Sequence, residues 1–339
     1  MEFGKQNKTG VEELRQVVHH VRFASGIYFC ISAVTTVIAN ALVLYNIQRQ
    51  ARKCFKSPTI YFIAGVCFTD LLNGILLEPL VGLCYFRNFK VCQDFSWTFE
   101  VLPPLLTNLS FFIVLLLSWV QYLAISHPYI YKQLVTKPRV ITSEIFALTY
   151  STTFSVLPYM GVPSKTVHIV DVIFHSTFVP FLLLISYLLI LTAVHRHARS
   201  RQTMTFRSFN SQTEHLHATE LKSRECRYGS DFSTDKTPKR KRKLIRRQTS
   251  VLRYVERQFV RVNLCLIVLL LVCTLPSIVV SYLTLNQKRA TTEQELRLSV
   301  AMIIAKDFLF LKFTLDPFIF ALSFRKLKDF SADWGYCCF

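Results

Sequence analysis

The stretch from Ser118 to Leu134, SWVQYLAISHPYIYKQL, places Gln121 and Tyr122 at the end of a strongly apolar run and then continues into a basic segment with Pro128. An apolar run of this kind is typical of a helix in a lipid bilayer, and the polar pair marks where that helix leaves it. Composition supports a membrane setting: of 339 residues, 51% are hydrophobic, 29 are Phe and only 9 are Gly. This composition excludes an ordinary soluble domain.

A helix that spans a bilayer needs about 20 predominantly apolar residues, because all its backbone hydrogen bonds must be made internally. Seven stretches meet this requirement and predict one all-α membrane domain over residues 24–322. They lie near residues 24–47, 60–86, 101–125, 140–161, 168–194, 262–285 and 298–322. The fourth is the least apolar, since it carries Glu144 and many Ser and Thr. Most connections are short, so consecutive helices are expected to lie antiparallel in one bundle.

Basic residues next to the membrane predict the orientation of the bundle. The loop of residues 195–261 has such residues at both of its helix ends: Arg196, Arg199 and Arg201, then Arg253, Arg257 and Arg261. This loop is therefore expected in the cytoplasm, and residues 1–23 form an extracellular tail of a multi-pass plasma-membrane protein. The tail lacks the apolar core of a signal peptide, so the first helix is expected to direct insertion. Asn7, in Asn7-Lys8-Thr9, is a glycosylation candidate, whereas Asn108 lies at membrane depth.

The net charge of +19 and the run PKRKRK at residues 238–243 suggest nucleic-acid binding at first sight. Seven spans argue against it, and we expect no nucleic-acid partner. A solvated loop near anionic lipid, worth about 1 kcal/mol per basic residue close to the surface, explains the charge better. Residues 203–236 have the composition of a disordered segment. From Arg246 onward, apolar residues recur at helical spacing and extend the sixth helix beyond the membrane.

Several short motifs occur in the chain in a fixed order. They are Asn40 in IANALVLYNI, Asp70 in GVCFTDLL, Gln121-Tyr122 with His127-Pro128, Pro180, Cys273-Thr274-Leu275-Pro276, Asp316-Pro317-Phe318-Ile319-Phe320, and Phe324–Phe330. In order and spacing this set resembles the rhodopsin-like family of G-protein-coupled receptors, over residues 25 to 331. The resemblance implies a seven-transmembrane helix bundle followed by a short amphipathic eighth helix and tail, residues 323–339. It also implies an extracellular ligand and a heterotrimeric G protein as partners, with no cofactor and no enzymatic activity.

The family's activation motifs are altered here. Gln121 stands where the family has an arginine, which replaces a permanently charged five-donor group by a neutral amide. Thr274 replaces a tryptophan and Phe320 a tyrosine. Pro276 and Pro317 each remove one helical hydrogen bond and are candidate pivots. The residues expected to serve activation or to face the G protein are Gln121, Tyr122, Cys273, Thr274, Pro276, Pro317 and Phe320. A non-signalling decoy or heteromer partner with the same fold stays an alternative, and a transporter is a more distant one.

Three ionisable residues are predicted to lie deep in the membrane, where each costs at least ~2.5–3.5 kcal/mol unless it is paired. Lys312 lies one turn before Asp316 and shares its helix face. In the family, the residues that match Asp70 and Ser110 hold a sodium ion. We therefore predict an internal ion cluster of Asp70, Ser110, Lys312 and Asp316, in which the ammonium replaces the ion. The alternative is that Lys312 reaches toward lipid headgroups.

The ligand-binding candidates are Glu78, Glu100, His175 and Lys306. The resemblance places Glu78, Glu100 and Lys306 at positions that commonly line the ligand pocket, and an ion pair between Glu78 and Lys306 is an equal alternative. Pro103 stands where amine receptors have an aspartate, and Phe310 where opsins have their lysine. Both substitutions disfavour those ligands and leave a peptide or another polar ligand.

Cysteines suggest two modifications and no metal site. Cys84 and Cys92 are candidates for a local disulfide across the first outer loop, because residues 162–172 contain no Cys to take the family's usual partner role. Cys337 and Cys338 are palmitoylation candidates after the expected terminal amphipathic helix. No Cys and His spacing is typical of a metal site.

Overall fold

The computed structural model describes residues 2–51, 58–87, 96–196, 237–287 and 291–333, and these are almost entirely helical, with no strand among them. The α-helices are α1 (Glu2–Ala51), α2 (Thr59–Leu72), α3 (Glu78–Phe86), α5 (Ser96–Ser126), α6 (Pro128–Leu134), α7 (Lys137–Val156), α8 (Ser164–Val170), α10 (Thr237–Asn286) and α11 (Thr292–Asp333). Two wider π-helical segments are η1 (Asn73–Leu77) and η3 (Asp171–Phe178), and η2 (Leu157–Met160) is a short 3-10 helix. The helix that contains α8 and η3 continues to Arg196.

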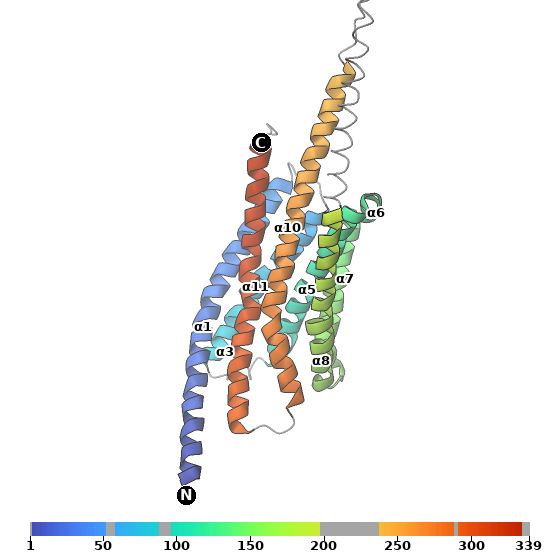
Figure 1. Ribbon diagram of the computed structural model, residues 1–339. Coiled ribbons are helices and arrows are strands. Elements are labelled where there is room, and N and C mark those ends of the chain that lie inside the picture. The colour runs from blue at the N-terminus through green and yellow to red at the C-terminus, as the bar shows by residue number, and fades with distance from the viewer. Residues whose placement is uncertain (1, 52–57, 88–95, 197–236, 288–290, 334–339) are drawn as a thin grey trace, which may run out of the picture.

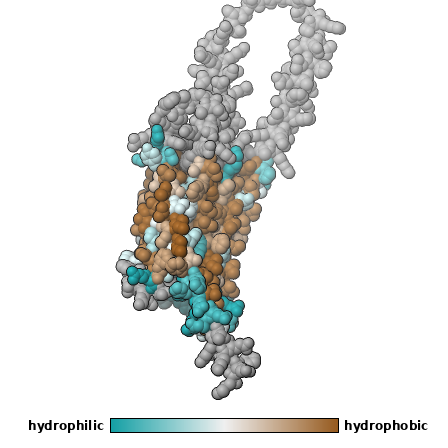
Figure 2. Space-filling model, turned by 90° about the vertical axis from the view of Figure 1, so that its left-hand side faces the viewer, coloured by the Kyte–Doolittle hydropathy of each residue, from teal (hydrophilic) through white to brown (hydrophobic). Residues whose placement is uncertain are grey.

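Six of these helices are long and apolar enough to cross a membrane: Gly10–Arg49, Thr59–Phe86, Trp97–Ser126, Lys137–Met160, Ser164–Arg196 and Val260–Asn286. The seventh, α11, packs lengthwise against α1 and α10. It is less apolar because Lys306, Asp307, Lys312 and Asp316 lie close together in its sequence. In Figure 2 a broad hydrophobic band lies between hydrophilic ends, as expected for a bundle that faces lipid.

The two ends of the bundle differ. Figure 1 places the N-terminus at one end and the C-terminus at the other, as an odd number of crossings requires. The short helix α6 and the long projecting part of α10 lie at the C-terminal end. The α10–α11 connection lies at the N-terminal end. We refer to these below as the N-terminal end and the C-terminal end of the bundle.

Several helices extend further than their apolar cores. The helix α1 begins at Glu2, within the predicted tail, and α10 begins at Thr237, ahead of the helical pattern noted from Arg246. The predicted eighth helix is not a separate element, because α11 runs unbroken to Asp333. The segment after the seventh span contains no Gly or Pro before Asp333 that would end the helix. The segment predicted to be disordered, 203–236, lies outside the described residues.

The two π-helical segments have the same cause. Each ends two residues before a proline, Pro79 after η1 and Pro180 after η3. Proline lacks an N–H, and its ring clashes with the carbonyl four residues earlier in a regular α-helix. A wider turn relieves this clash and leaves carbonyls for other donors, as Thr177 shows by donating to the carbonyl of Val172 at 2.8 Å. The side chains around each segment therefore point differently than an unbroken α-helix would direct them.

Candidate functional site

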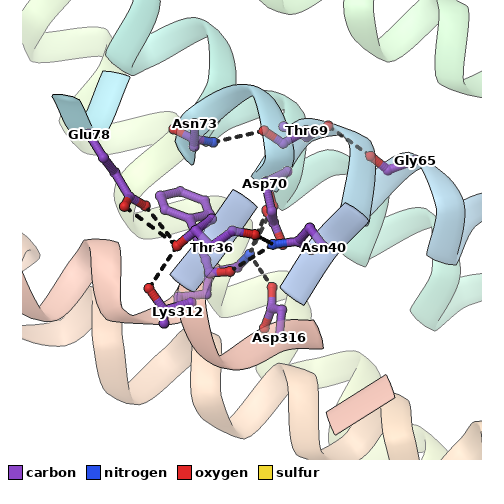
Figure 3. A network of polar contacts seen from close by, with 12 residues as sticks. Thr36, Asn40, Gly65, Thr69, Asp70, Asn73, Glu78, Lys312 and Asp316 are labelled. Atoms are coloured by element: carbon purple, nitrogen blue, oxygen red, sulfur yellow. Dashed lines mark hydrogen bonds and ion pairs between the residues drawn. The ribbon is translucent and has the colours of Figure 1, made fainter. Parts of the chain in front are cut away.

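An ion cluster lies in the centre of the bundle, where α2, α5 and α11 meet (Figure 3). The Nζ atom of Lys312 lies 2.6 Å from Oδ2 of Asp316 and 3.7 Å from Oδ1 of Asp70. It also donates to Oγ of Ser110 at 2.9 Å. The three ionisable side chains are at most 1% exposed. The structure thus brings together all four residues of the predicted cluster, and the ammonium does not reach toward headgroups.

The local helical spacing explains this arrangement. Lys312 and Asp316 are one turn apart on α11, so their side chains lie on the same face. An ammonium has three N–H donors and no acceptor, which suits one hydroxyl and two carboxylates. One cation still cannot neutralise two anions, and both carboxylate oxygens of Asp70 and Oδ1 of Asp316 are buried without a hydrogen bond. The positive and negative charges of the cluster therefore do not cancel, which makes the cluster sensitive to any change in its members.

A layer of neutral groups surrounds the cluster on the side of α1. Asn40 donates to the backbone carbonyls of Thr36 and Phe313, at 3.0 and 3.3 Å, and so ties α1 to α11. The Thr36 hydroxyl shares a 2.9 Å hydrogen bond with Thr314 and lies 3.2 Å from Oε1 of Glu78. Glu78 is fully buried, and Figure 3 shows its carboxylate pointing toward Thr36. Its carboxylate thus contacts α1, and the described residues contain no ion pair between Glu78 and Lys306.

A second polar network joins α5, α7 and η3. His175 is 1% exposed: Nε2 forms a 3.2 Å hydrogen bond with the Tyr150 hydroxyl, and Nδ1 lies 3.1 Å from Oδ1 of Asp171 without the geometry of a hydrogen bond. Asn108 donates to the same Asp171 oxygen at 3.0 Å. Aromatic rings of Phe112, Phe154 and Phe174 surround the imidazole. Asp171 is partly exposed and is held by Asn108, whereas His175 is buried beside it and does not itself line an open surface.

The remaining ligand candidates lie apart from one another. Glu100 is exposed near the start of α5 and accepts a 3.2 Å hydrogen bond from Tyr159. Lys306 is on α11 with an exposed side chain. The four residues predicted from sequence thus do not form one contiguous site. Asp171, Tyr150 and Asn108 were missed, and the only sequence signal for them was the spacing of four between Asp171 and His175.

Comparison with known proteins agrees with the seven-helix arrangement. Residues 39–320 match the sequence pattern of the family described as "7 transmembrane receptor (rhodopsin family)". The chain belongs to this family. Among individual relatives of this receptor, the sex peptide receptor of Drosophila melanogaster is 23% identical, with 51% of this chain and 48% of that protein covered. The alignment thus spans about half the length of that relative.

The receptor also resembles a solved structure of the family. Squid rhodopsin superposes with a TM-score of 0.64 over 94% of this chain and 87% of its own, at 16% sequence identity. At that identity the likeness concerns the fold. Family and fold together identify a seven-transmembrane signalling receptor of the rhodopsin family.

The altered activation motifs lie on three helices of the receptor, α5, α10 and α11. Gln121 is buried near the C-terminal end of the bundle, and the ring of Tyr122 packs edge-on against His127. On α10, the Thr274 hydroxyl donates to the Leu270 carbonyl of its own helix at 2.8 Å. The other predicted members, Cys273 and Phe320, are buried, and Pro276 and Pro317 lie inside unbroken helices.

A direct link between α5 and α10 was not foreseen from the sequence. Ser118 and Asn263 are fully buried, and Nδ2 of Asn263 donates a hydrogen bond to Oγ of Ser118 at 3.2 Å. The Ser118 hydroxyl also donates to the Val114 carbonyl at 2.7 Å. The pair lies one turn from Gln121. It provides a neutral polar contact between two helices that the sequence alone gave no reason to pair.

The covalent candidates are only partly described. Cys84 is disulfide-bonded, and Cys30, Cys67, Cys265 and Cys273 are free. The partner of Cys84, like Cys92, lies outside the described residues, as do Cys337 and Cys338. Asn7 lies within α1. Among the described residues no group of three or more His, Cys, Asp or Glu could hold a metal ion.

Proposed function

We propose that this receptor transmits the binding of an extracellular peptide, or another polar ligand, to a heterotrimeric G protein. The observation that carries the proposal is the family match over residues 39–320 on a seven-helix bundle whose termini lie at opposite ends. The basic residues that flank the 197–236 segment favour a cytoplasmic C-terminal end and a plasma-membrane receptor with its N-terminus outside. The relative in Drosophila is a receptor named for a peptide, which supports a peptide ligand.

The ion cluster has a separate role in this proposal. The family's sodium ion would need the space between Asp70, Asp316 and Ser110, and Nζ of Lys312 already lies within 2.6 to 3.7 Å of all three. The residues present therefore do not fit a sodium ion beside this lysine. We infer that Lys312 is a cation supplied by the chain itself and that the native receptor is insensitive to sodium.

A second candidate function is a silent partner receptor. The replacement of the family's arginine by Gln121, and of its tryptophan by Thr274, favours a chain that binds ligand or another receptor without activating a G protein. The buried Ser118–Asn263 contact argues for the signalling alternative, because it offers a breakable link between α5 and α10 close to Gln121.

Three covalent features complete the proposal: a disulfide between Cys84 and Cys92, glycosylation at Asn7 and palmitoylation at Cys337 and Cys338. Each fits the orientation proposed above, since the first two lie on the outer side and the third on the cytoplasmic side. Mass spectrometry of receptor purified from animal cells, before and after reduction, glycosidase and hydroxylamine treatment, tests all three.

Basal G-protein signalling distinguishes the two candidate functions. The native receptor, a Gln121→Arg variant and an empty vector are compared at matched surface expression with a panel of G-protein reporters. Signalling by the native chain above the vector supports the proposal. Signalling by the Gln121→Arg variant alone would show that the fold is intact but that the native chain does not activate a G protein, which supports the silent partner receptor. If neither chain signals, with or without an extract of candidate peptides, the signalling proposal is abandoned.

A further inference from the structure

Lys306 combines two properties that normally exclude each other. It lies on the same face of α11 as Ile303, Phe310 and Phe313, which are three, four and seven residues away from it and are buried in the bundle. Its own side chain is nevertheless exposed, unlike those three. An exposed side chain on a buried helix face projects into an open volume inside the bundle. Lys306 thus borders an internal space and does not face lipid.

The depth of Lys306 supports this reading. It lies eight residues beyond the predicted membrane entry at Leu298, about 12 Å along the helix at 1.5 Å per residue. A lysine side chain spans roughly half that distance, so its ammonium cannot reach bulk water along the outside of the helix. Water must enter through the open volume from the N-terminal end.

The ammonium has no counter-ion among the described residues. Four carboxylates lie in the same half of the bundle, and each is held by other groups. Glu78 contacts Thr36, Asp307 accepts a 2.6 Å hydrogen bond from Ser25 on α1, Glu100 accepts from Tyr159, and Asp171 contacts Asn108 and His175. By contrast, the buried Lys312 has two carboxylates within 3.7 Å. Lys306 is therefore a cation placed at an internal space without an anion to neutralise it.

We propose that Lys306 recognises an anionic group of the ligand, such as the carboxylate of a peptide, in a water-filled cavity that opens at the N-terminal end. This inference rests on the proposed receptor function and specifies the chemistry of its ligand. An anion that enters the cavity forms a charge-assisted hydrogen bond with this ammonium. A ligand whose acidic group is amidated or esterified loses this contact and binds more weakly.

The test measures the local potential directly and requires no identified ligand. Met302 lies one turn nearer the N-terminal end on the same face and is partly buried. A Met302→Cys receptor in lipid nanodiscs is reacted with two methanethiosulfonates, the anionic 2-sulfonatoethyl and the cationic 2-trimethylammonioethyl reagent. Intact-mass analysis gives both rates. The receptor without Met302→Cys corrects for the native thiols, of which Cys30 and Cys265 are exposed.

The ratio of the labelling rate of the anionic reagent to that of the cationic reagent is compared between the receptor with Lys306 and matched variants at that position. We expect the ratio to fall about tenfold or more in Lys306→Gln, as a unit charge some 8 Å away in a partly aqueous site predicts. Lys306→Arg should keep the native ratio and Lys306→Glu should invert it. The same series on Ser299→Cys, one further turn outward, should show the same order with smaller differences, and it replaces Met302→Cys if that variant fails to fold.

Two results would overturn the inference. Equal ratios in the Lys306 and Lys306→Gln receptors would show that the ammonium creates no anion-selective site. Failure of both reagents to label Cys at either position would show that no water-filled volume exists there. Neither result depends on G-protein coupling, so a silent receptor with a strong anion preference would contradict the proposed signalling and leave the ligand site intact.

Discussion

Removal of the Lys312 ammonium should both destabilise the receptor and create sodium sensitivity. Met is the chosen replacement because it is unbranched, similar in length and apolar. In the native chain the ammonium lies 2.6 Å from Asp316 and 3.7 Å from Asp70, and both carboxylates are fully buried. Removal of one partner from a buried ion pair typically costs about 3–5 kcal/mol, because the remaining charge is left without compensation. With two carboxylates left, we expect Lys312→Met to lose at least about 3 kcal/mol.

The same substitution vacates the space beside the carboxylates. The oxygens of Asp70, Asp316 and Ser110 are then hard ligands of the kind that small hard cations prefer. Binding of a cation to the folded state alone stabilises it by mass action, by about 2.7 kcal/mol at a concentration one hundred times the dissociation constant. Sodium should therefore recover much of the lost stability in Lys312→Met and have no specific effect on the native receptor.

Thermal unfolding in detergent provides the assay. A fluorogenic thiol reagent reports the exposure of Cys67 and Cys273, which are free and buried in the folded state. Tm is measured in sodium chloride, potassium chloride and choline chloride at equal ionic strength, so that general screening cancels. The Lys312→Met/Asp316→Asn double variant is the control, because it lacks the carboxylate that the cation would need most.

The reasoning is refuted by either of two results. A Lys312→Met receptor with native Tm would show that the ammonium is not needed to compensate the carboxylates. A rise in the Tm of the native receptor in sodium, relative to potassium and choline, would show that the ion binds beside Lys312 and that the ammonium does not take its place.

Two further predictions concern helix contacts. Asn263→Leu removes the hydrogen bond that Nδ2 of Asn263 donates to Ser118, worth about 1 kcal/mol net. If this bond holds α5 against α10, basal nucleotide exchange rises several-fold at equal surface expression, whereas an unchanged or lower basal rate would show that it does not restrain the switch. Gly65→Ala would place a Cβ atom 2.7 Å from Oε1 of Glu144, at the far end of a flexible side chain that can move aside. Because Ala also favours a helix by about 1 kcal/mol over Gly, we expect an unchanged or slightly higher Tm; a clear fall in Tm that disappears in a Glu144→Ala background would show that the Glu144 side chain cannot move.

The seven spans and the central ion cluster could be predicted because their signals are local. Apolar length identifies a span, and the spacing of four between Lys312 and Asp316 places both side chains on one face of α11. A charge in the membrane also needs a partner wherever the helices meet, so Asp70 was the natural candidate. The extent of the helices was harder to predict, because α1 and α11 continue as helices beyond their apolar cores.

The direction of side chains near the π-helical segments could not be predicted. In an unbroken α-helix, Glu78 would lie about 80° around the axis from Asp70 at 100° per residue. The wider turns of η1 rotate Glu78 back toward the face of Asp70, where it meets Thr36 of α1. The pattern of apolar residues contains no sign of this rotation. The alternative of an ion pair between Glu78 and Lys306 is not realised among the described residues for this reason, and Lys306 is left without that carboxylate.

The departures from the family's motifs share one physical property. At the ion cluster, a lysine of the chain takes the place proposed for a diffusible cation. At the C-terminal end, the neutral Ser118–Asn263 pair links α5 and α10. This pair lies near Gln121, the neutral residue at the position of the family's arginine. A diffusible ion can leave when the helices move, whereas an ammonium fixed to α11 must move with that helix and keep or exchange its carboxylate partners. A neutral buried pair is likewise little affected by salt, because screening acts mainly on exposed charges. The balance between the receptor's conformations should therefore depend on its own side chains and on the ligand, and only weakly on the ionic composition around it.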